Sequence, residues 1–312
     1  MDRHDMETRE RFRGALLGLA CGDAVGTSVE FERRGSFAPL TDMVGGGPFA
    51  LQPGQWTDDT SMALCLATSL LECGGFDAAD QMRRYCRWMD EGYLSCTGEC
   101  FDIGMTVCDA LRRFQDDEDE AFAGSTDPRT AGNGCLMRLA PVPMYYFSDR
   151  GSAIAHAGDS ARTTHGAQEC IDASRLFGAM LWLALSGATK AATLSGHGLS
   201  DLRSERLASI ARGAYRGRQA DAIRGNGYVV DSLEAALWSF ERTTSFEEAV
   251  LCAANLGDDA DTTAAICGQL AGAFYGEAGI PQHWQDRLAW TERIRALADR
   301  LHDASVFVPA TS

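Results

Sequence analysis

The sequence has few basic residues, and none of its apolar runs is long. It contains 28 Lys and Arg against 44 Asp and Glu, for a formal net charge of -16. A nucleic-acid-binding surface needs clustered Lys and Arg to displace counterions, so this balance argues against a nucleic-acid partner. It does not exclude a nucleotide-like small ligand, because a bound metal ion supplies positive charge.

We expect no membrane span, signal peptide or paired cysteine motif in this chain. No apolar run approaches the roughly 20 residues that cross a bilayer. GALLGLACG (14–22) follows a mixture of acids and arginines, unlike a basic leader. The 11 cysteines are scattered and include no Cys-x-x-Cys pair, which excludes a disulfide framework and a zinc site. We therefore expect a reduced, cytoplasmic protein with no membrane segment.

Helical periodicity dominates, and the nearest approach to a strand pattern is the short GYVVDS (227–232). Asp231 with Glu234, and Ser245 with Glu248, fit the capping box that begins a helix. TAAICGQLAGAF has small residues all round, which suits close helix packing. These patterns predict an all-α fold. The expected helices cover 9–21, 60–72, 77–91, 102–114, 168–186, 203–212, 231–241, 245–255, 262–275 and 283–303.

No linker or internal repeat divides the chain. The acidic run QDDEDE (115–120) leads into a long loop, AGSTDPRTAGNG (123–134), in a place where functional loops occur. We expect one compact domain over residues 1–312, in which 277–312 adds a C-terminal helix that packs on the rest.

Two distant segments concentrate acids where a helix begins. In GQWTDDTSM, Asp58 and Asp59 adjoin, and in LGDDADTT, Asp258, Asp259 and Asp261 crowd together. One acid at a helix start is an ordinary cap. Several carboxylates repel one another and lose hydration if they are buried, and a hard cation such as Mg²⁺ relieves both costs. The residues alone leave two readings open: helix caps with solvated acids, or a metal site with two ions about 4 Å apart.

Seven motifs together resemble the ADP-ribosylglycohydrolase family, of the type that includes the dinitrogenase-reductase-activating glycohydrolase. The resemblance covers about residues 11–276 and implies an all-α fold with two Mg²⁺ or Mn²⁺ ions in a cleft. The motifs are, in order, GDAVGTSVEF (22–31), WTDDTSM (56–62), CFDIG (100–104), GNGCLMRLAPV (132–142), ARTTHG (161–166), GYVVDSLEAALWSF (227–240) and GDDADTTAAICGQLAGAFYG (257–276).

The resemblance implies which residues ligate the metals. Asp261 would bridge both ions, and Glu30 would release its ion when substrate arrives. Asp258 stands where the family often has Gly and is not expected to ligate. The implied ligand set is Thr57, Asp58, Asp59, Asp259, Asp261, Thr262 and Glu30.

The resemblance also implies a substrate site. Asp102, which on its own fits a helix cap, would face the scissile bond and pair with a guanidinium leaving group. His165 would contact the phosphates, and the ring of Tyr228, otherwise a core aromatic, would stack on adenine. His156 has no implied role. The cradle for ADP-ribose would comprise Gly132, Asn133, Gly134, Cys135 and Met137.

The implied reaction is hydrolysis of the N-glycosidic bond between ADP-ribose and a protein arginine, through an oxocarbenium-like transition state. Either Glu30 or Asp102 would act as general base or acid. The partners would be an ADP-ribosylated protein, ADP-ribose as product, and a cognate ADP-ribosyltransferase or toxin. The alternatives are hydrolysis of ADP-ribosyl-serine, O-acetyl-ADP-ribose or ADP-ribosylated nucleic acid, and a non-catalytic ADP-ribose-binding or crystallin-like role.

Overall fold

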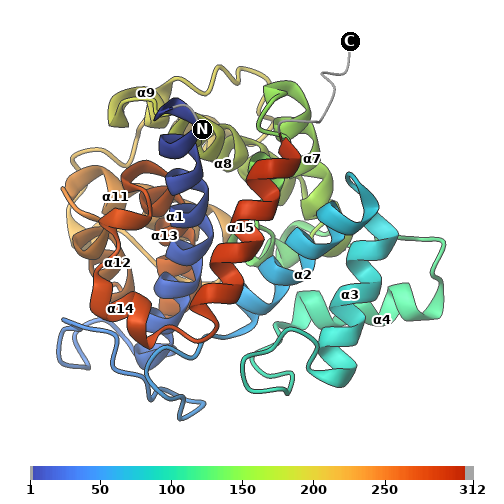
Figure 1. Ribbon diagram of the computed structural model, residues 1–312, viewed down its shortest axis with the longest axis horizontal. Coiled ribbons are helices and arrows are strands. Elements are labelled where there is room, and N and C mark those ends of the chain that lie inside the picture. Colours follow the sequence, from blue (N-terminus) through green and yellow to red (C-terminus); the bar gives the residue numbers. More distant parts are fainter. Residues whose placement is uncertain (1–2, 306–312) are drawn as a thin grey trace.

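Helices form almost all of the regular structure in the computed structural model, which describes residues 3–305. Over this range only isolated β-bridges occur, one of them between Gly132 and Tyr228, and no strand forms at 227–232. The all-α prediction is therefore confirmed (Figure 1). The α-helices are α1 (Arg3–Gly26), α2 (Asp58–Cys73), α3 (Ala78–Glu91), α4 (Met105–Asp116), α5 (Gly134–Met137), α6 (Pro141–Tyr145), α7 (Arg150–Thr164), α8 (Gln168–Leu185), α9 (Lys190–Ser195), α10 (Glu205–Ala211), α11 (Val229–Arg242), α12 (Phe246–Ala254), α13 (Ala260–Tyr275), α14 (Gln282–Arg287) and α15 (Thr291–Ser305).

The antiparallel pair α1 and α13 forms the centre of the molecule, because glycines let the two backbones touch. A Cβ on Gly18 would lie 2.3 Å from the carbonyl oxygen of Gly268, and one on Gly22 would lie 2.2 Å from that of Ala264. Real Cβ atoms do not approach backbone so closely, so only glycine fits at these contacts. The contact points repeat every four residues of α1, at Gly14, Gly18, Gly22 and Gly26.

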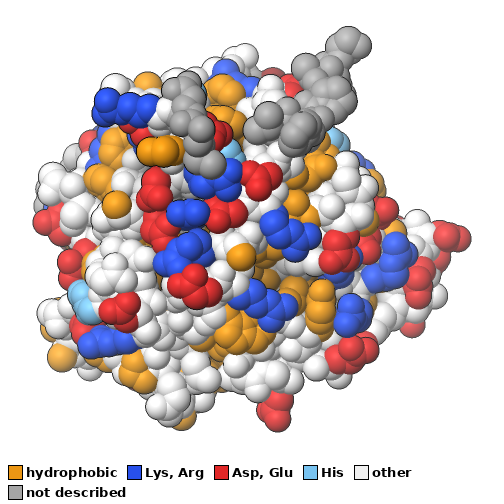
Figure 2. Space-filling view, in the orientation of Figure 1, with side chains coloured by type: hydrophobic (Ala, Val, Ile, Leu, Met, Phe, Trp, Pro, Cys, Tyr) orange, Lys and Arg blue, Asp and Glu red, His pale blue; other side chains and the backbone are white. Residues whose placement is uncertain are grey.

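The other helices surround this pair. In Figure 1, α15 lies beside α1, α2 to α4 extend to one side, and α11, α12 and α14 lie on the other. Where one C-terminal helix was expected, the described residues form two, α14 and α15, with a break at Trp290, whose φ is 63°. Residues 306–312 of that expectation lie outside the described range. Figure 2 shows basic and acidic side chains interspersed over α1 and α15, where Arg9 and Arg13 pair with Asp299.

Several local predictions need correction. α1 extends beyond 9–21 at both ends, and α7 was not expected at all, because its sequence has no clear apolar stripe. The short helices α5, α6 and α9 were not expected either. Asp231 caps nothing: α11 begins two residues earlier, and Asp231 accepts hydrogen bonds from Arg206 and Asn226 instead. The Ser245 hydroxyl caps the Glu248 amide as predicted, and the Glu248 carboxylate accepts from the amide and the hydroxyl of Thr244.

Over residues 3–305, no helix combines the length and the apolar character that a bilayer crossing requires.

Candidate metal centre and substrate cavity

The two predicted acid clusters meet directly. The first turns of α2 and α13 lie side by side, and the Thr262 hydroxyl donates to Asp59 Oδ1 over 3.1 Å, across 203 sequence positions. In neither cluster does the N-cap side chain, Thr57 or Asp259, make a capping hydrogen bond. Asp58 and Asp59 are also buried. The interpretation of these segments as simple caps with solvated acids is therefore wrong.

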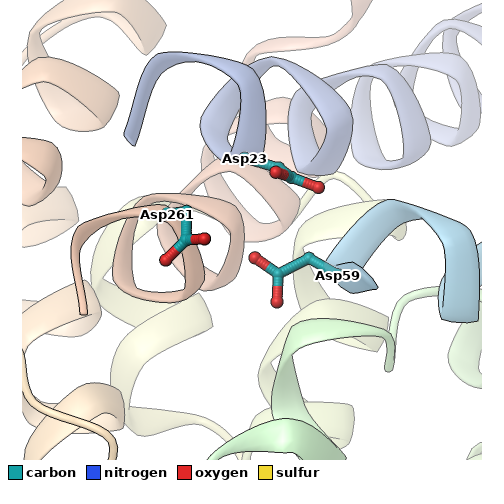
Figure 3. A group of neighbouring side chains, drawn as sticks. All are labelled: Asp23, Asp59 and Asp261. Atoms are coloured by element: carbon teal, nitrogen blue, oxygen red, sulfur yellow. The ribbon is translucent and has the colours of Figure 1, made fainter. Parts of the chain in front are cut away.

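Two groups of carboxylates share Asp261. Oxygens of Asp23, Asp59 and Asp261 lie within 4.8 Å of one another, and so do oxygens of Glu30, Asp102 and Asp261. Figure 3 shows the first group, which comes from α1, α2 and α13 and faces a common space. A residue that belongs to both groups is placed as a bridging ligand would be.

Asp23 was missed from the sequence, although it is the lone acid in a buried stretch of α1. Its Oδ1 accepts from the amide and hydroxyl of Thr57, and its Oδ2 accepts from the amide and hydroxyl of Thr60, over 2.6–3.0 Å. Both oxygens are thus occupied by the first turn of α2. Asp23 caps α2 from another helix and fixes the position of Asp58 and Asp59.

The residues of this cluster fit a hard divalent cation. Asp59 Oδ2 and Glu30 Oε2 are buried without a hydrogen-bond partner. Burial and then the neighbouring carboxylates raise the pKa of Glu30, Asp58 and Asp261. Carboxylates in this state gain stability from positive charge at short range, which a divalent cation supplies.

A cavity of about 890 Å³ opens above the cluster. This volume lies within the range of about 300–1,000 Å³ that is usual for small-ligand sites. Asp102 lines it at φ 61°, and it does not cap α4, whose N-cap is Gly104. Asp258 also lines it but is exposed, whereas Asp259 is half-buried and accepts from the Asn133 amide over 2.7 Å. The acids that line the cavity are Glu30, Asp58, Asp102, Asp258, Asp259 and Asp261.

Comparison with known proteins identifies the family to which this chain belongs. The ADP-ribosylglycohydrolase family model matches residues 4–308. The chain belongs to the ADP-ribosylglycohydrolase family. It is 46% identical to an ADP-ribosylarginine hydrolase Tri1 of Pseudomonas putida, over 94% of this chain and 78% of that protein.

Two further comparisons agree. An ADP-ribosyl-[dinitrogen reductase] glycohydrolase of Rhodospirillum rubrum is 31% identical over 89% of this chain and 90% of its own length. The solved structure of an ADP-ribosylglycohydrolase-related protein complex matches with a TM-score of 0.84 at 42% identity, over 96% of this chain and 99% of that one.

The ADP-ribosylglycohydrolase motif GNGCLM forms one wall of the cavity. Gly132, Gly134 and Met137 line it, and the His165 ring packs against both glycines. A Cβ on Gly134 would lie 2.8 Å from His165 Cε1, so glycine is needed for the ring to fit. Cys135 does not line the cavity, because its thiol points back towards the carbonyl oxygens of Gly132 and Cys170.

His165 stays neutral near physiological pH. Burial, followed by the charge of Arg138, lowers its pKa to about 3, and its Nδ1 lies 2.8 Å from the Thr164 hydroxyl. Arg138 is itself fully buried and donates to Gly134 O over 2.9 Å and to Thr164 Oγ1 over 2.5 Å. This pair of side chains therefore supports the glycine wall from behind.

Tyr228 lies beside this wall but does not line the cavity. Its hydroxyl donates to Glu169, and the Arg206 guanidinium lies 4.9 Å from the ring centroid. Stacking on adenine stays a prediction, and it would require the ring face that Arg206 leaves uncovered. His156, for which no role was expected, stacks on Phe76 with the ring centroids 5.0 Å apart.

Proposed function

We propose that this chain is a divalent-metal-dependent hydrolase that removes ADP-ribose from modified arginine side chains of proteins. The observation that carries the proposal is the shared carboxylate cluster of Glu30, Asp102 and Asp261 at the wall of a ligand-sized cavity. Relatives that are 46% and 42% identical are ADP-ribosylarginine hydrolases, which supports the arginine linkage.

Two Mg²⁺ or Mn²⁺ ions would be held by oxygen ligands from both acid turns. When bound, such ions supply Lewis acidity to sugar hydroxyls and lower the pKa of a water. The uncompensated oxygens Asp59 Oδ2 and Glu30 Oε2 support this assignment, and Asp23 would hold the first turn of α2 in position. The proposed ligands are Thr57, Asp58, Asp59, Asp259, Asp261, Thr262 and Glu30.

Glu30 and Asp102 are the proposed proton-transfer residues. Burial raises the pKa of both carboxyl groups, and nearby carboxylates raise it further: Asp102 for Glu30, and Asp23 and Asp259 for Asp102. As the ribose C–N bond breaks, a protonated carboxyl group with a raised pKa can give its proton to the departing guanidine nitrogen, and a carboxylate can take one proton from the attacking water. After cleavage the protonated guanidinium is a cation, and Asp102 at the cavity surface would pair with it.

The glycine wall would hold the ADP-ribose. Gly132 and Gly134 let backbone approach a pyrophosphate closely. A neutral His165 can donate a hydrogen bond to a phosphate through one ring nitrogen while the other stays with Thr164.

A second candidate is hydrolysis of other ADP-ribosyl linkages. An ADP-ribosylhydrolase ARH3 of Bos taurus is 27% identical over 94% of this chain. A panel of ADP-ribosyl-arginine protein, ADP-ribosyl-serine peptide and O-acetyl-ADP-ribose separates the candidates. We expect release of ADP-ribose from the arginine substrate in Mg²⁺ or Mn²⁺ and none in a chelator. Turnover of the serine substrate alone would overturn the arginine assignment.

A cognate ADP-ribosyltransferase or toxin is a further proposed partner, since the enzyme's substrate must come from such a transferase.

A further inference from the structure

The two most exposed large apolar side chains of the described residues both belong to the cavity. Phe31 is 67% exposed and Met105 is 84% exposed, and both line it. The other large apolar side chains that reach the surface are less exposed and lie elsewhere: Met6, Val44 and Phe122. Apolar groups that gather at the entrance of a site indicate a surface that becomes covered.

Phe31 is also held in an unfavourable backbone conformation. Its φ is 63°, in the left-handed region that bulky residues avoid. Neither the strain nor the exposed ring adds to stability, and strained residues cluster at functional sites. Asp102 and Asp258 are strained in the same sense, with φ of 61° and 58°, and they line the same cavity.

Two backbone hydrogen bonds hold Phe31 in place. Its amide donates to Asp258 O over 2.7 Å, and the Asp258 amide donates to Glu32 O over 2.7 Å. These bonds join the segment after Glu30 to the segment before Asp259. The Phe31 ring therefore projects from a fixed backbone position at the metal centre, while Met105 projects from the first turn of α4.

We propose that Phe31 and Met105 form a docking rim that binds the polypeptide around the modified arginine, an inference that rests on the proposed function. The ADP-ribose portion of the substrate is polar and fills the cavity, whereas the arginine stem and its neighbouring residues stay outside. Phe31 and Met105 are the exposed apolar side chains of the cavity lining, and Asp258 adds an exposed carboxylate.

The rim defines the chemistry of the partner. It fits an apolar side chain next to the modified arginine, because such a side chain covers the ring and the thioether. It disfavours an acidic neighbour, since Asp258 and the other cavity acids repel one. The occupant is thus a protein segment with an apolar residue beside the ADP-ribosylated arginine.

The test compares two substrates. One is a peptide whose ADP-ribosylated arginine is flanked by leucines, and the other is ADP-ribosyl-arginine amide, which has no neighbouring residues. The quantity is the ratio of kcat/KM for the peptide to kcat/KM for the amide. The variants are Phe31→Asn, since Asn tolerates the left-handed conformation, and Met105→Gln. Met6→Gln is the matched control, and Phe31→Tyr retains the ring.

We expect the ratio to fall about tenfold in Phe31→Asn and in Met105→Gln, as for a central contact residue, and to stay unchanged in Met6→Gln and Phe31→Tyr. A ratio within about twofold of wild type in both rim variants, or an equal loss on both substrates, would overturn the docking rim alone. If the wild type hydrolyses neither substrate, the proposed function and the docking rim are both overturned.

Discussion

Replacing Gly22 by alanine should separate the two central helices. The new Cβ would lie 2.2 Å from Ala264 O and 2.5 Å from Ala264 C. Non-bonded atoms in contact prefer about 3.5–4.0 Å, so α1 and α13 must move apart by more than about 1 Å. The obstacle is backbone, which cannot rotate away as a side chain would.

The expected cost follows from this overlap. Overpacking of a rigid core costs about 3 kcal/mol at its upper range, and alanine returns about 1 kcal/mol of helix propensity. We expect the free energy of unfolding to fall by about 2 kcal/mol. Because Asp23 is the next residue and caps α2, Mn²⁺ affinity should fall as well.

Urea denaturation followed by circular dichroism measures the first effect. Gly158→Ala is the matched control, because a Cβ on this α7 glycine would meet only side chains, those of Arg175 at 3.0 Å from Cγ and Ile171 at 3.4 Å from Cγ2, and no backbone. It should leave stability unchanged or raise it slightly. If Gly22→Ala is as stable as wild type, or if both variants lose stability equally, the close packing of α1 on α13 does not have the role described.

Three further results are expected. Asp58→Ala should lose more than about a hundredfold in kcat while remaining folded, because a ligand matters more than its outer partners; retained turnover would refute the metal assignment. Asp23→Ala should weaken Mn²⁺ binding about 10–100-fold by releasing the first turn of α2, as a titration would show, and unchanged affinity would argue against that role. The pKa of His165 in the folded protein is near 3, below the 6.5 of an unfolded chain, so as pH falls the unfolded state takes up the proton first. Stability therefore drops by about 1.4 kcal/mol per pH unit below about 6.5 until the folded pKa is reached. Urea denaturation at about pH 5 and pH 7 should show less of this loss in His165→Gln, and an equal loss would contradict it.

The contact between the two acid clusters could be predicted from the sequence, because adjacent buried carboxylates repel one another unless they share a cation. One cation can relieve the charge repulsion in both segments, Asp58 with Asp59 and Asp259 with Asp261. The Thr262–Asp59 hydrogen bond confirms that the two segments are in contact. Sequence spacing alone could not identify Asp23. Its partners, Thr57 and Thr60, lie at the start of α2, and only the packing of α1 against this end of α2 brings them within reach.

The missed and shifted helices have local causes. α7 is rich in Ala, Gly and Ser, so no apolar stripe marks it, and the signal that remained was Asp149, whose side chain accepts from the amides of Gly151 and Ser152. α11 begins at Val229 because Asn133 N donates to Gly227 O and Val229 N donates to Ala131 O. These long-range contacts outweigh the local capping signal at Asp231.

Titration of the protein with Mn²⁺, followed by electron paramagnetic resonance of the free ion, tests the metal centre most directly. We expect two bound ions per wild-type chain. Asp261→Ala should bind neither ion, because Asp261 belongs to both carboxylate groups, and Asp258→Ala, which changes an exposed residue, should still bind both. Stoichiometric binding that survives in Asp261→Ala, or no binding by the wild type, would contradict a metal centre built from these two acid turns.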